Sequence, residues 1–276
     1  MTKHQKGAYK PEEAVYHNDG REERLLEFIQ SHPNYKEMQG NPEIILAAID
    51  EYGHKHDFLM NVGWEKGKIV AEKLIPEVRP DFMIELGGYV GYSALFFGSA
   101  LRRAGGRKYL SLEASPRFAA VAAALMELAG LDDVVDIIVG PCRDSLRKIR
   151  QTYPTGAVDV LFIDHAKFQY VGDLKLCEEL GLVRPGTTVI ADNVISPGNP
   201  EYRAYVREST RDKIRRVDQE QKVQMTSLAD LSKEQSMGNP YLTYDTTLIE
   251  SFAPTGEPGE VDERGKKESW MCGLSA

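Results

Sequence analysis

The sequence is poor in cysteine, and its cysteines form no recognisable pattern. The 276 residues include only three, Cys142, Cys177 and Cys272, and no two of them are close along the chain. Scattered cysteines without a CxxC pair predict neither a disulfide framework nor a cysteine-ligated zinc site. Such usage is typical of proteins that fold in a reducing compartment.

Long hydrophobic runs are also absent. The most apolar stretch, residues 86–101, contains four glycines and is shorter than the ~20 residues that a membrane-spanning helix needs. The first 20 residues have no apolar segment of the kind found in a secretory signal peptide. We therefore expect a cytoplasmic protein that has no membrane partner.

Basic residues are fewer than acidic ones. The chain has 34 lysines and arginines against 42 acidic residues, which gives a formal net charge of −8. Proteins that bind nucleic acid generally carry a basic surface, and anionic lipids attract basic segments. The charge balance therefore argues against a nucleic-acid or membrane partner, and it leaves the oligomeric state open.

The ends of the chain differ from its middle in composition. Residues 1–20 are polar, and residues 254–276 are rich in glycine, proline and charge. We expect these ends to be a flexible N-terminal segment and a C-terminal tail. Hydrophobic residues make up 42% of the sequence, and 276 residues are ample for a hydrophobic core. The sequence therefore predicts one folded domain over residues 21–253.

Short apolar runs alternate with helical patterns through the middle of the chain. The predicted strands are residues 82–86, 109–112, 134–139, 158–163 and 187–191, and the predicted helices are residues 21–31, 41–52, 91–104, 116–130, 142–152 and 172–181. Apolar strands separated by helices are typical of a parallel sheet covered on both faces. We predict a doubly wound α/β domain, with an antiparallel edge formed by residues 214–225 and 241–250.

Ligands of such domains bind beyond the carboxyl ends of the strands, so the residues that follow each strand are the functional candidates. The first strand runs into ELGGYVGYS, residues 85–93, in which Gly87, Gly88 and Gly91 permit a tight turn close to a ligand. The helix that follows offers free N–H groups to an anion. A simple strand-to-helix turn explains the same glycines, because the spacing matches neither GxGxxG nor a Walker loop.

Glu113 ends the second strand. A carboxylate at this position can accept hydrogen bonds from both hydroxyls of a ribose. The glycine turn contains no lysine or arginine that could clamp a phosphate. Together these features favour an adenosyl ligand without a pyrophosphate. The alternative is a surface acid ahead of the helix that begins at Ser115-Pro116.

Acidic and amide side chains follow the fourth and fifth strands. Asp164 comes after the fourth strand, and Asp192 and Asn193 come after the fifth. Two carboxylates and an amide are hard oxygen ligands of the kind that bind partly hydrated Mg²⁺. Acids that merely cap the next elements are the simpler interpretation, but an unpaired acid after an apolar strand is costly to bury. The sequence therefore predicts a magnesium site made by these three residues.

Several strings, in the same order along the chain, resemble the catechol O-methyltransferases. They are MNVG (60–63), ELGGYVGYS (85–93), LEASP (112–116), DHAK (164–167), ADNVISPG (191–198) and AYVRES (204–209), and the resemblance covers about residues 20–210. Members of this family depend on S-adenosylmethionine and have a seven-stranded, Rossmann-like sheet and a Mg²⁺ ion. The resemblance implies a transferase that methylates one hydroxyl of a catechol, a small-molecule substrate.

The resemblance also assigns roles to single residues. Lys167 would be the general base, and Asp164, Asp192 and Asn193 would bind Mg²⁺. S-adenosylmethionine would contact Val62, Glu85, Gly87, Tyr89, Ser93, Glu113, Ala114, Cys142, Arg143, Asp164 and His165, with Glu85 near its amino group, Glu113 on its ribose, and Cys142 and Arg143 at its adenine edge. The catechol would contact Phe58, Met60, Asn61, Lys167, Asn193 and Pro197. A structural histidine and a core methionine are the alternatives for His165 and Met60.

The chain departs from the family pattern around the substrate. Ala166 stands where the animal enzymes have tryptophan, and Phe58 replaces a second tryptophan. The family's acid for the second substrate hydroxyl has no counterpart that the sequence identifies. Thr243 stands at its place in the similar string YLTY, and the C-terminal part carries an insertion.

The implied reaction moves a methyl group from a sulfonium to a phenolic oxygen. A free phenol has a pKa near ~10, so Mg²⁺ would stabilise the phenolate and hold both oxygens of a diol, while Lys167 takes the proton. The alternatives are a cation-dependent O-methyltransferase for caffeoyl-CoA-like or other vicinal-diol phenols, a NAD-binding oxidoreductase and a non-catalytic binding module. The MNVG and DHAK strings favour the catechol type, and the metal set with Lys167 argues against the binding module.

Overall fold

The computed structural model describes residues 19–153, 156–226, 236–252, 254 and 268–275. Its strands form one sheet in the order β3-β2-β1-β4-β5-β7-β6. The strands are β1 (Phe82–Leu86), β2 (Lys108–Glu113), β3 (Val135–Val139), β4 (Val160–Ile163), β5 (Thr188–Ala191), β6 (Tyr244–Ser251) and β7 (Glu268–Ser275). Strands β1 to β5 are parallel, and β7 is antiparallel to both β5 and β6. The predicted Rossmann-like, mostly parallel sheet is confirmed.

Helices separate the parallel strands, and further helices precede β1 and lie between β5 and β6. The α-helices are α1 (Arg21–Gln30), α2 (Tyr35–Met38), α3 (Pro42–Lys55), α4 (Trp64–Lys68), α5 (Ile75–Val78), α6 (Tyr92–Arg103), α7 (Pro116–Leu128), α8 (Cys142–Thr152), α9 (Tyr170–Glu179), α10 (Pro200–Tyr205) and α11 (Thr210–Thr226). Short π or 3-10 segments are η1 (Ile69–Leu74), η2 (Lys167–Gln169) and η3 (Val194–Gly198).

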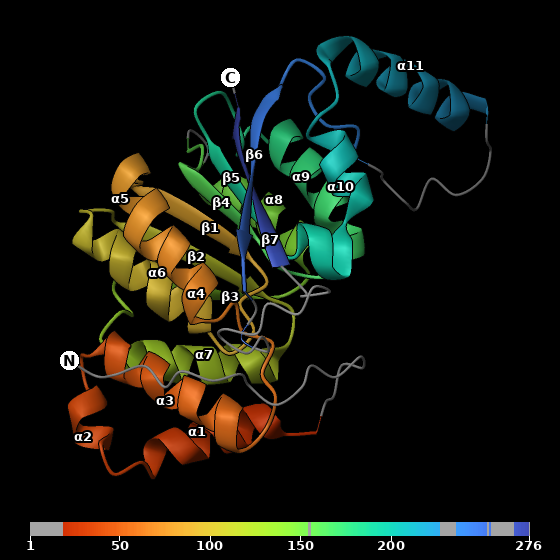
Figure 1. Cartoon of the computed structure of the whole chain (residues 1–276). Coiled ribbons are helices and arrows are strands. Elements are labelled where there is room, and N and C mark those ends of the chain that lie inside the picture. The colour runs from red at the N-terminus through yellow and green to blue at the C-terminus, as the bar shows by residue number, and fades with distance from the viewer. Residues whose placement is uncertain (1–18, 154–155, 227–235, 253, 255–267, 276) are drawn as a thin grey trace.

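The sheet is a central layer with helices on both faces. Figure 1 shows α4, α5 and α6 on one side and α8, α9 and α10 on the other. Each face buries its own hydrophobic cluster, and alternate residues of β1 enter different clusters: Met83 joins one, and Ile84 joins the other. Because successive strand side chains point to opposite faces, strands buried on both faces are apolar throughout.

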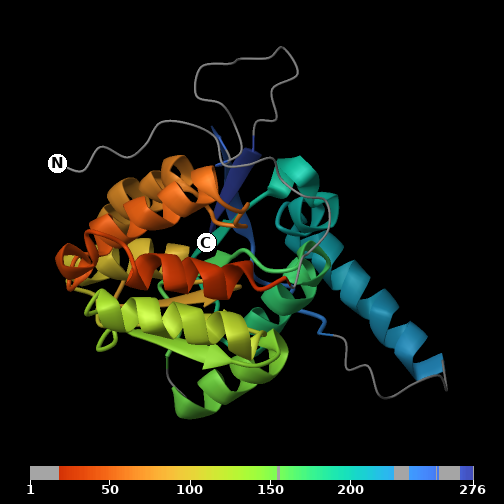
Figure 2. The ribbon, with the colours of Figure 1, turned by 90° about the horizontal axis from the view of Figure 1, so that it is seen from below.

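The N-terminal helices add to one of these faces. Figure 2 shows α1 lying between α3 and α7, and Leu25 and Ile29 of α1 are fully buried. Helix α3 begins as predicted, because the Asn41 side chain accepts a hydrogen bond from the backbone N–H of Ile44 and Pro42 occupies the first turn.

The strand order reverses beside β1. The chain passes from β1 through α6 to β2 on one side, whereas β4 pairs with the opposite edge of β1. A crevice opens at such a switch point, beyond the carboxyl ends of the strands. Strand β6 runs parallel to β5, because both are antiparallel to β7, so the carboxyl end of β6 comes to the same edge.

The prediction of a strand over residues 214–225 is wrong, because this segment belongs to the helix α11. Its sequence, KIRRVDQEQKVQMT from Lys213, consists mainly of good helix formers and lacks the alternation of a strand. Arg216 and Glu220, four residues apart, form an ion pair with an N–O distance of 3.3 Å. Helix α11 projects from the body of the molecule in both views (Figures 1 and 2).

The segment predicted as a C-terminal tail, residues 254–276, contains the strand β7. This strand pairs with β5 and β6, so it forms the predicted antiparallel edge in place of residues 214–225. The charged and glycine-rich residues ahead of β7 dominate the composition of the segment. Composition alone therefore predicts a tail and does not reveal the strand. No helix in the described part of the chain is long and apolar enough to cross a membrane. The cytoplasmic location stays a prediction.

Candidate active site

A cavity of about 880 Å³ lies beyond the carboxyl ends of β1, β2, β4 and β5. It is lined by most of the predicted site residues: Phe58, Met60, Asn61, Val62, Gly87, Tyr89, Ser93, Glu113, Ala114, Cys142, Arg143, Asp164, His165, Lys167, Asp192 and Asn193. Glu85 is not among the lining residues. Pro197 lies in η3, and its side chain falls outside the described part of the chain.

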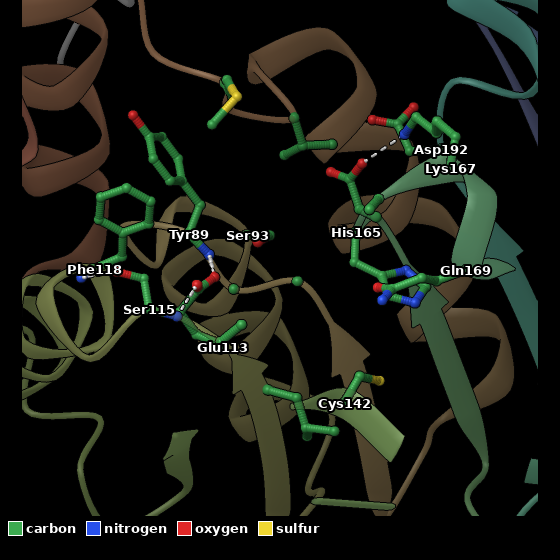
Figure 3. Close-up of a pocket in the computed structure, with 18 of the residues that line it drawn as sticks. Tyr89, Ser93, Glu113, Ser115, Phe118, Cys142, His165, Lys167, Gln169 and Asp192 are labelled. Atoms are coloured by element: carbon green, nitrogen blue, oxygen red, sulfur yellow. Dashed lines mark hydrogen bonds and ion pairs between the residues drawn. The ribbon is translucent and has the colours of Figure 1, made fainter. Parts of the chain in front are cut away.

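The cavity has two chemically different sides. In Figure 3, Tyr89, Glu113, Ser115 and Phe118 gather on one side, and His165, Lys167 and Asp192 lie on the other. The first side comes from the turns after β1 and β2, and the second comes from the ends of β4 and β5. A ligand that fills the cavity therefore meets both.

The turn after β1 requires glycine for a reason that the structure makes explicit. Gly87 has φ +99°, which is in the region that favours glycine. A Cβ atom on Gly87 would lie 2.6 Å from the carbonyl oxygen of Asp164 and 2.9 Å from Cα of His165. The turn therefore packs directly on the backbone that leaves β4, which brings the two sides of the cavity together.

Glu113 is fixed at the tip of β2 by backbone groups. Its Oε2 accepts the N–H of Tyr89 at 2.8 Å, and its Oε1 accepts the N–H of Ser115 at 2.7 Å. Burial raises the pKa of Glu113 above its ordinary value, and the backbone N–H groups oppose that rise. Each carboxylate oxygen can accept a second hydrogen bond, so the side chain can still receive hydroxyl groups from a ligand.

Glu85 lies behind the cavity wall, and its side chain is fully buried. Its Oε2 accepts the hydroxyl of Ser111 at 2.5 Å, whereas Oε1 has no hydrogen-bond partner among the described residues. Burial raises the pKa of Glu85 to about 7. Ser93, which does line the cavity, is one of the neighbours that oppose this rise.

Asp164 and Asp192 bring two carboxyl groups to adjacent strand ends. The preceding residues, Ile163 and Ala191, are partners in the register of β4 and β5. Burial, followed by the charge of Asp192, raises the pKa of Asp164 to about 7. A buried acid whose ionisation is opposed by a neighbouring carboxylate belongs to a site that a cation would stabilise.

Lys66 is a member of this site that the sequence analysis missed. Its ammonium lies 2.7 Å and 2.9 Å from the two carboxylate oxygens of Asp192, and both side chains are about 2% exposed. The spacing offers one signal, because Lys66 falls four residues after Val62 and four before Val70, both of which are buried. Helical periodicity from Lys66 to Val70 therefore places the lysine on a buried face.

Lys167 is held next to the acids by three oxygen atoms. Its Nζ lies 2.7 Å from the Tyr170 hydroxyl, 2.9 Å from Asn193 Oδ1 and 3.3 Å from Asp164 Oδ1. The lysine side chain is 27% exposed and lines the cavity, so it is accessible to a ligand. The structure thus places Lys167 beside two of the three predicted metal ligands, Asp164 and Asn193.

A second set of contacts organises the wall near Cys142. His165 Nε2 lies 2.8 Å from Asp173 Oδ2, and Arg143 Nη1 lies 3.3 Å from Asp173 Oδ1. Cys142, His165 and Asp173 offer metal-ligating atoms within 4.8 Å of one another. The carboxylate is already shared by His165 and Arg143, however, and the guanidinium opposes a further cation. We interpret Asp173, which the sequence analysis also missed, as the residue that orients these two wall side chains.

The opening of the cavity combines apolar and amide groups. Phe58 is buried, and Met60 is 45% exposed. Asn61 is buried, and neither its Oδ1 nor its Nδ2 has a hydrogen-bond partner in the part of the chain that the structure covers. Pro254, just beyond β6, also lines the cavity. A buried amide without partners indicates that a ligand or water satisfies it.

Comparison with known proteins yields a consistent set of relatives. A family model described as a methyltransferase domain matches residues 84–194. The catechol O-methyltransferase of Mus musculus is 40% identical over 190 residues, which make up 69% of this chain and 69% of that protein. The catechol O-methyltransferase of Bos taurus is 36% identical over 202 residues, which make up 73% and 72% of the two chains.

Solved structures show the same fold at lower sequence identity. The O-methyltransferase of Bacillus cereus in complex with SAH has a TM-score of 0.51 and is 19% identical, and the match covers 95% of this chain and 93% of that one. At this identity, the likeness speaks for the fold alone.

Proposed function

Because the chain belongs to the catechol O-methyltransferase family, we propose that it transfers a methyl group from S-adenosylmethionine to one hydroxyl of a catechol. The reaction needs a site for the methyl donor, a way to favour the ionised hydroxyl and a group that accepts the proton. One observation carries the proposal. A single cavity contains the glycine turn with Glu113 on one side and three oxygen ligands beside Lys167 on the other.

Buried polar atoms in and behind the cavity wall that have no hydrogen-bond partner within the described part of the chain support a site for S-adenosylmethionine. The amide of Asn61, Oε1 of Glu85 and Nδ1 of His165 are buried without hydrogen-bond partners among the described residues. Such groups cost stability unless a ligand or water pairs with them. We assign the carboxylate of Glu85 to the ammonium group of the methionine part, behind Ser93. Glu113 would accept the ribose hydroxyls, and Cys142 and Arg143 would form the adenine edge.

The oxygen-bearing side chains beside Lys167 are suited to binding Mg²⁺. Asp164, Asp192 and Asn193 supply two carboxylates and an amide carbonyl, which are the hard ligands that this ion prefers. In the structure, the ammonium groups of Lys66 and Lys167 lie against these same side chains, so the site attracts positive charge. A bound Mg²⁺ would favour the ionised form of a phenol and hold the two oxygens of a diol.

Lys167 is the general base in this proposal. It must be in its amine form to accept a proton, and the acceptor hydroxyl then delivers that proton to Nζ. The Tyr170 hydroxyl donates to the backbone carbonyl of Asp192 at 3.1 Å, so its own position is fixed. Tyr170 and Asn193 together hold the lysine Nζ at the cavity wall. Positioning of the base and of the acceptor oxygen supplies much of the expected acceleration.

The substrate class is tested by a panel of phenols incubated with S-adenosylmethionine that carries a labelled methyl group. We expect label on catechols in the presence of Mg²⁺ and at most trace label on the matching monophenols, because only a diol could offer two oxygens to a bound Mg²⁺ ion. Equal labelling of monophenols and catechols would contradict the proposal. A strong preference for a caffeoyl-coenzyme A ester over free catechols would instead identify a related cation-dependent O-methyltransferase.

A further inference from the structure

A segment from the C-terminal part of the chain reaches the wall of the cavity. Ser236 lies 93 residues beyond Arg143, yet its Oγ accepts a hydrogen bond from Arg143 Nη2 at 2.8 Å. Ser236 is only 5% exposed, whereas Arg143 lines the cavity. The serine hydroxyl thus contacts the arginine without itself lining the cavity.

The other end of the guanidinium is also fixed. Nη1 of Arg143 donates to the backbone carbonyl of Gly172 at 3.2 Å and to Oδ1 of Asp173 at 3.3 Å. The same carboxylate holds His165, whose Nε2 lies 2.8 Å from Oδ2. A hydrogen-bonded chain therefore runs from Ser236 through Arg143 and Asp173 to His165, and two of its members line the cavity.

The segment that carries Ser236 is anchored independently of the cavity. The backbone N–H of Gly238 donates to Glu179 at 3.0 Å, and that of Asn239 donates to Glu178 at 2.7 Å. Glu178 in turn accepts the hydroxyls of Tyr205 at 2.6 Å and Tyr244 at 2.5 Å.

Gly238 makes this close approach possible. It has φ +79°, and a Cβ atom there would collide with the Tyr205 hydroxyl and the Glu178 carboxylate. The segment is therefore seated on the end of α9, and this seating sets where the Ser236 hydroxyl lies.

We propose that Ser236 is a positioning residue for the adenine end of the cofactor, and that it acts by holding the guanidinium of Arg143. This inference rests on the proposed function, which assigns Arg143 to the adenine edge. An arginine side chain has many rotamers, so a ligand that meets an unrestrained arginine must also order it. The hydroxyl of Ser236 reduces that cost before the cofactor binds. The metal ligands and Lys167 lie outside this chain of contacts.

The proposal predicts a loss of cofactor affinity without a loss of turnover. Ser236→Ala should weaken S-adenosylhomocysteine, measured by calorimetry, about three- to tenfold, which is the loss expected for one hydrogen bond. The KM for S-adenosylmethionine should rise by a similar factor, while kcat at saturating cofactor stays within twofold. Ser209→Ala is the matched control, because the Ser209 hydroxyl pairs with Asp212 at the start of α11. It should leave the affinity, the KM and kcat unchanged.

A double-mutant cycle separates positioning from a general effect on folding. In an Arg143→Ala background, Ser236→Ala should cause no further loss of affinity, because the group that it positions is absent. Additive losses, or an unchanged affinity in Ser236→Ala alone, would overturn the inference. If the parent protein itself binds no S-adenosylhomocysteine, the proposed function fails, which is a distinguishable result.

Discussion

At the scale of single residues, mutation of Lys167 gives a sharp test, because a catalytic lysine and an ordinary surface lysine predict very different effects on the reaction rate. A surface lysine changed to methionine alters stability by at most ~0.5 kcal/mol and leaves rates alone, whereas a general base contributes roughly 10²–10⁴ in rate. We expect Lys167→Met to slow single-turnover methyl transfer about 100-fold at neutral pH. The loss should shrink as the pH rises, because phenols ionise without help near pH ~10.

The control for this variant is Lys148→Met, an exposed lysine of α8. It should react at the parent rate across the same pH range. If Lys167→Met transfers the methyl group within threefold of the parent rate at neutral pH, Lys167 is not the general base.

Lys66 supports a second prediction at this scale, which concerns stability. Removal of one partner from a buried ion pair is costly, by about 3 kcal/mol or more, because the other charge stays buried. Lys66→Met should therefore lower the free energy of unfolding by about this amount in EDTA. Millimolar Mg²⁺ should recover part of the loss, since a cation bound at Asp192 replaces the missing ammonium.

The exposed neighbour Lys68 provides the matched variant, because its side chain is 41% exposed. Lys68→Met should change the unfolding curve little under either condition. An equal loss for Lys66→Met with and without Mg²⁺ would show that Asp192 does not belong to a metal site.

The sequence identifies the site residues at the strand ends far better than the residues that hold those side chains in position. Glu113, Asp164 and Asp192 follow apolar strands directly, so the fold class alone brings them to one edge. Lys66 and Ser236 act through partners 126 and 93 residues away. Helical spacing indicates that Lys66 is buried, but the identity of its partner depends on how helices and loops pack, which no local pattern predicts.

At the scale of the elements, the turn between β1 and α6 carries the clearest prediction. An alanine at Gly87 would be strained at φ +99° and would also press on the backbone of Asp164. We expect Gly87→Ala to destabilise the protein by roughly 2–4 kcal/mol and to weaken S-adenosylhomocysteine at least tenfold. Urea unfolding and calorimetry measure the two effects.

Gly105 isolates the contribution of backbone strain. It has φ +89°, and a Cβ atom there would meet nothing within 4 Å. Gly105→Ala should cost only about 1–2 kcal/mol and should leave cofactor affinity unchanged. If the two variants behave alike, the close approach of the turn to Asp164 has no functional importance.

The same scale shows where sequence patterns succeed. The five predicted parallel strands match β1 to β5 within two residues, because strands buried on both faces give continuous apolar runs. Of the two segments predicted for the antiparallel edge, residues 241–250 match β6, whereas residues 214–225 form the helix α11 and β7 takes their place. Strand β7 follows a charged, glycine-rich stretch, and what identifies it is its pairing with β5 and β6, which is a tertiary property.

At the scale of the whole molecule, Glu85 links stability to pH. Burial raises the pKa of Glu85 from its ordinary value of 4.5 to about 7. The folded state therefore binds the proton more tightly than the unfolded state. The stabilisation is fully present below pH 4.5 and is lost as the pH rises through 7, and it amounts to about 3 kcal/mol.

Glu85→Gln should remove this dependence. Between pH 5 and pH 8, the free energy of unfolding of the cofactor-free parent should fall by about 2–3 kcal/mol more than that of the variant. Urea denaturation at the two pH values provides the test. Parallel pH profiles would mean that Glu85 titrates normally in the folded protein.

The sheet as a whole explains why one cavity contains such different groups. The strand order reverses at β1, so the turns after β1 and β2 face the ends of β4 and β5 across the crevice. This arrangement places Glu113, which we propose holds the ribose, across the crevice from Lys167 and the proposed metal ligands. A direct methyl transfer between two bound molecules would require such a placement.

The most direct test of the account is product analysis of one catechol after incubation with S-adenosylmethionine, for the parent protein and for Asp164→Asn. We predict that mass spectrometry detects the monomethyl ether for the parent with Mg²⁺, and only traces of it for the parent in excess EDTA or for the variant. S-adenosylhomocysteine should still bind the variant, which shows that its cavity is intact. Undiminished monomethyl ether in EDTA, or none from the parent with Mg²⁺, would contradict the account.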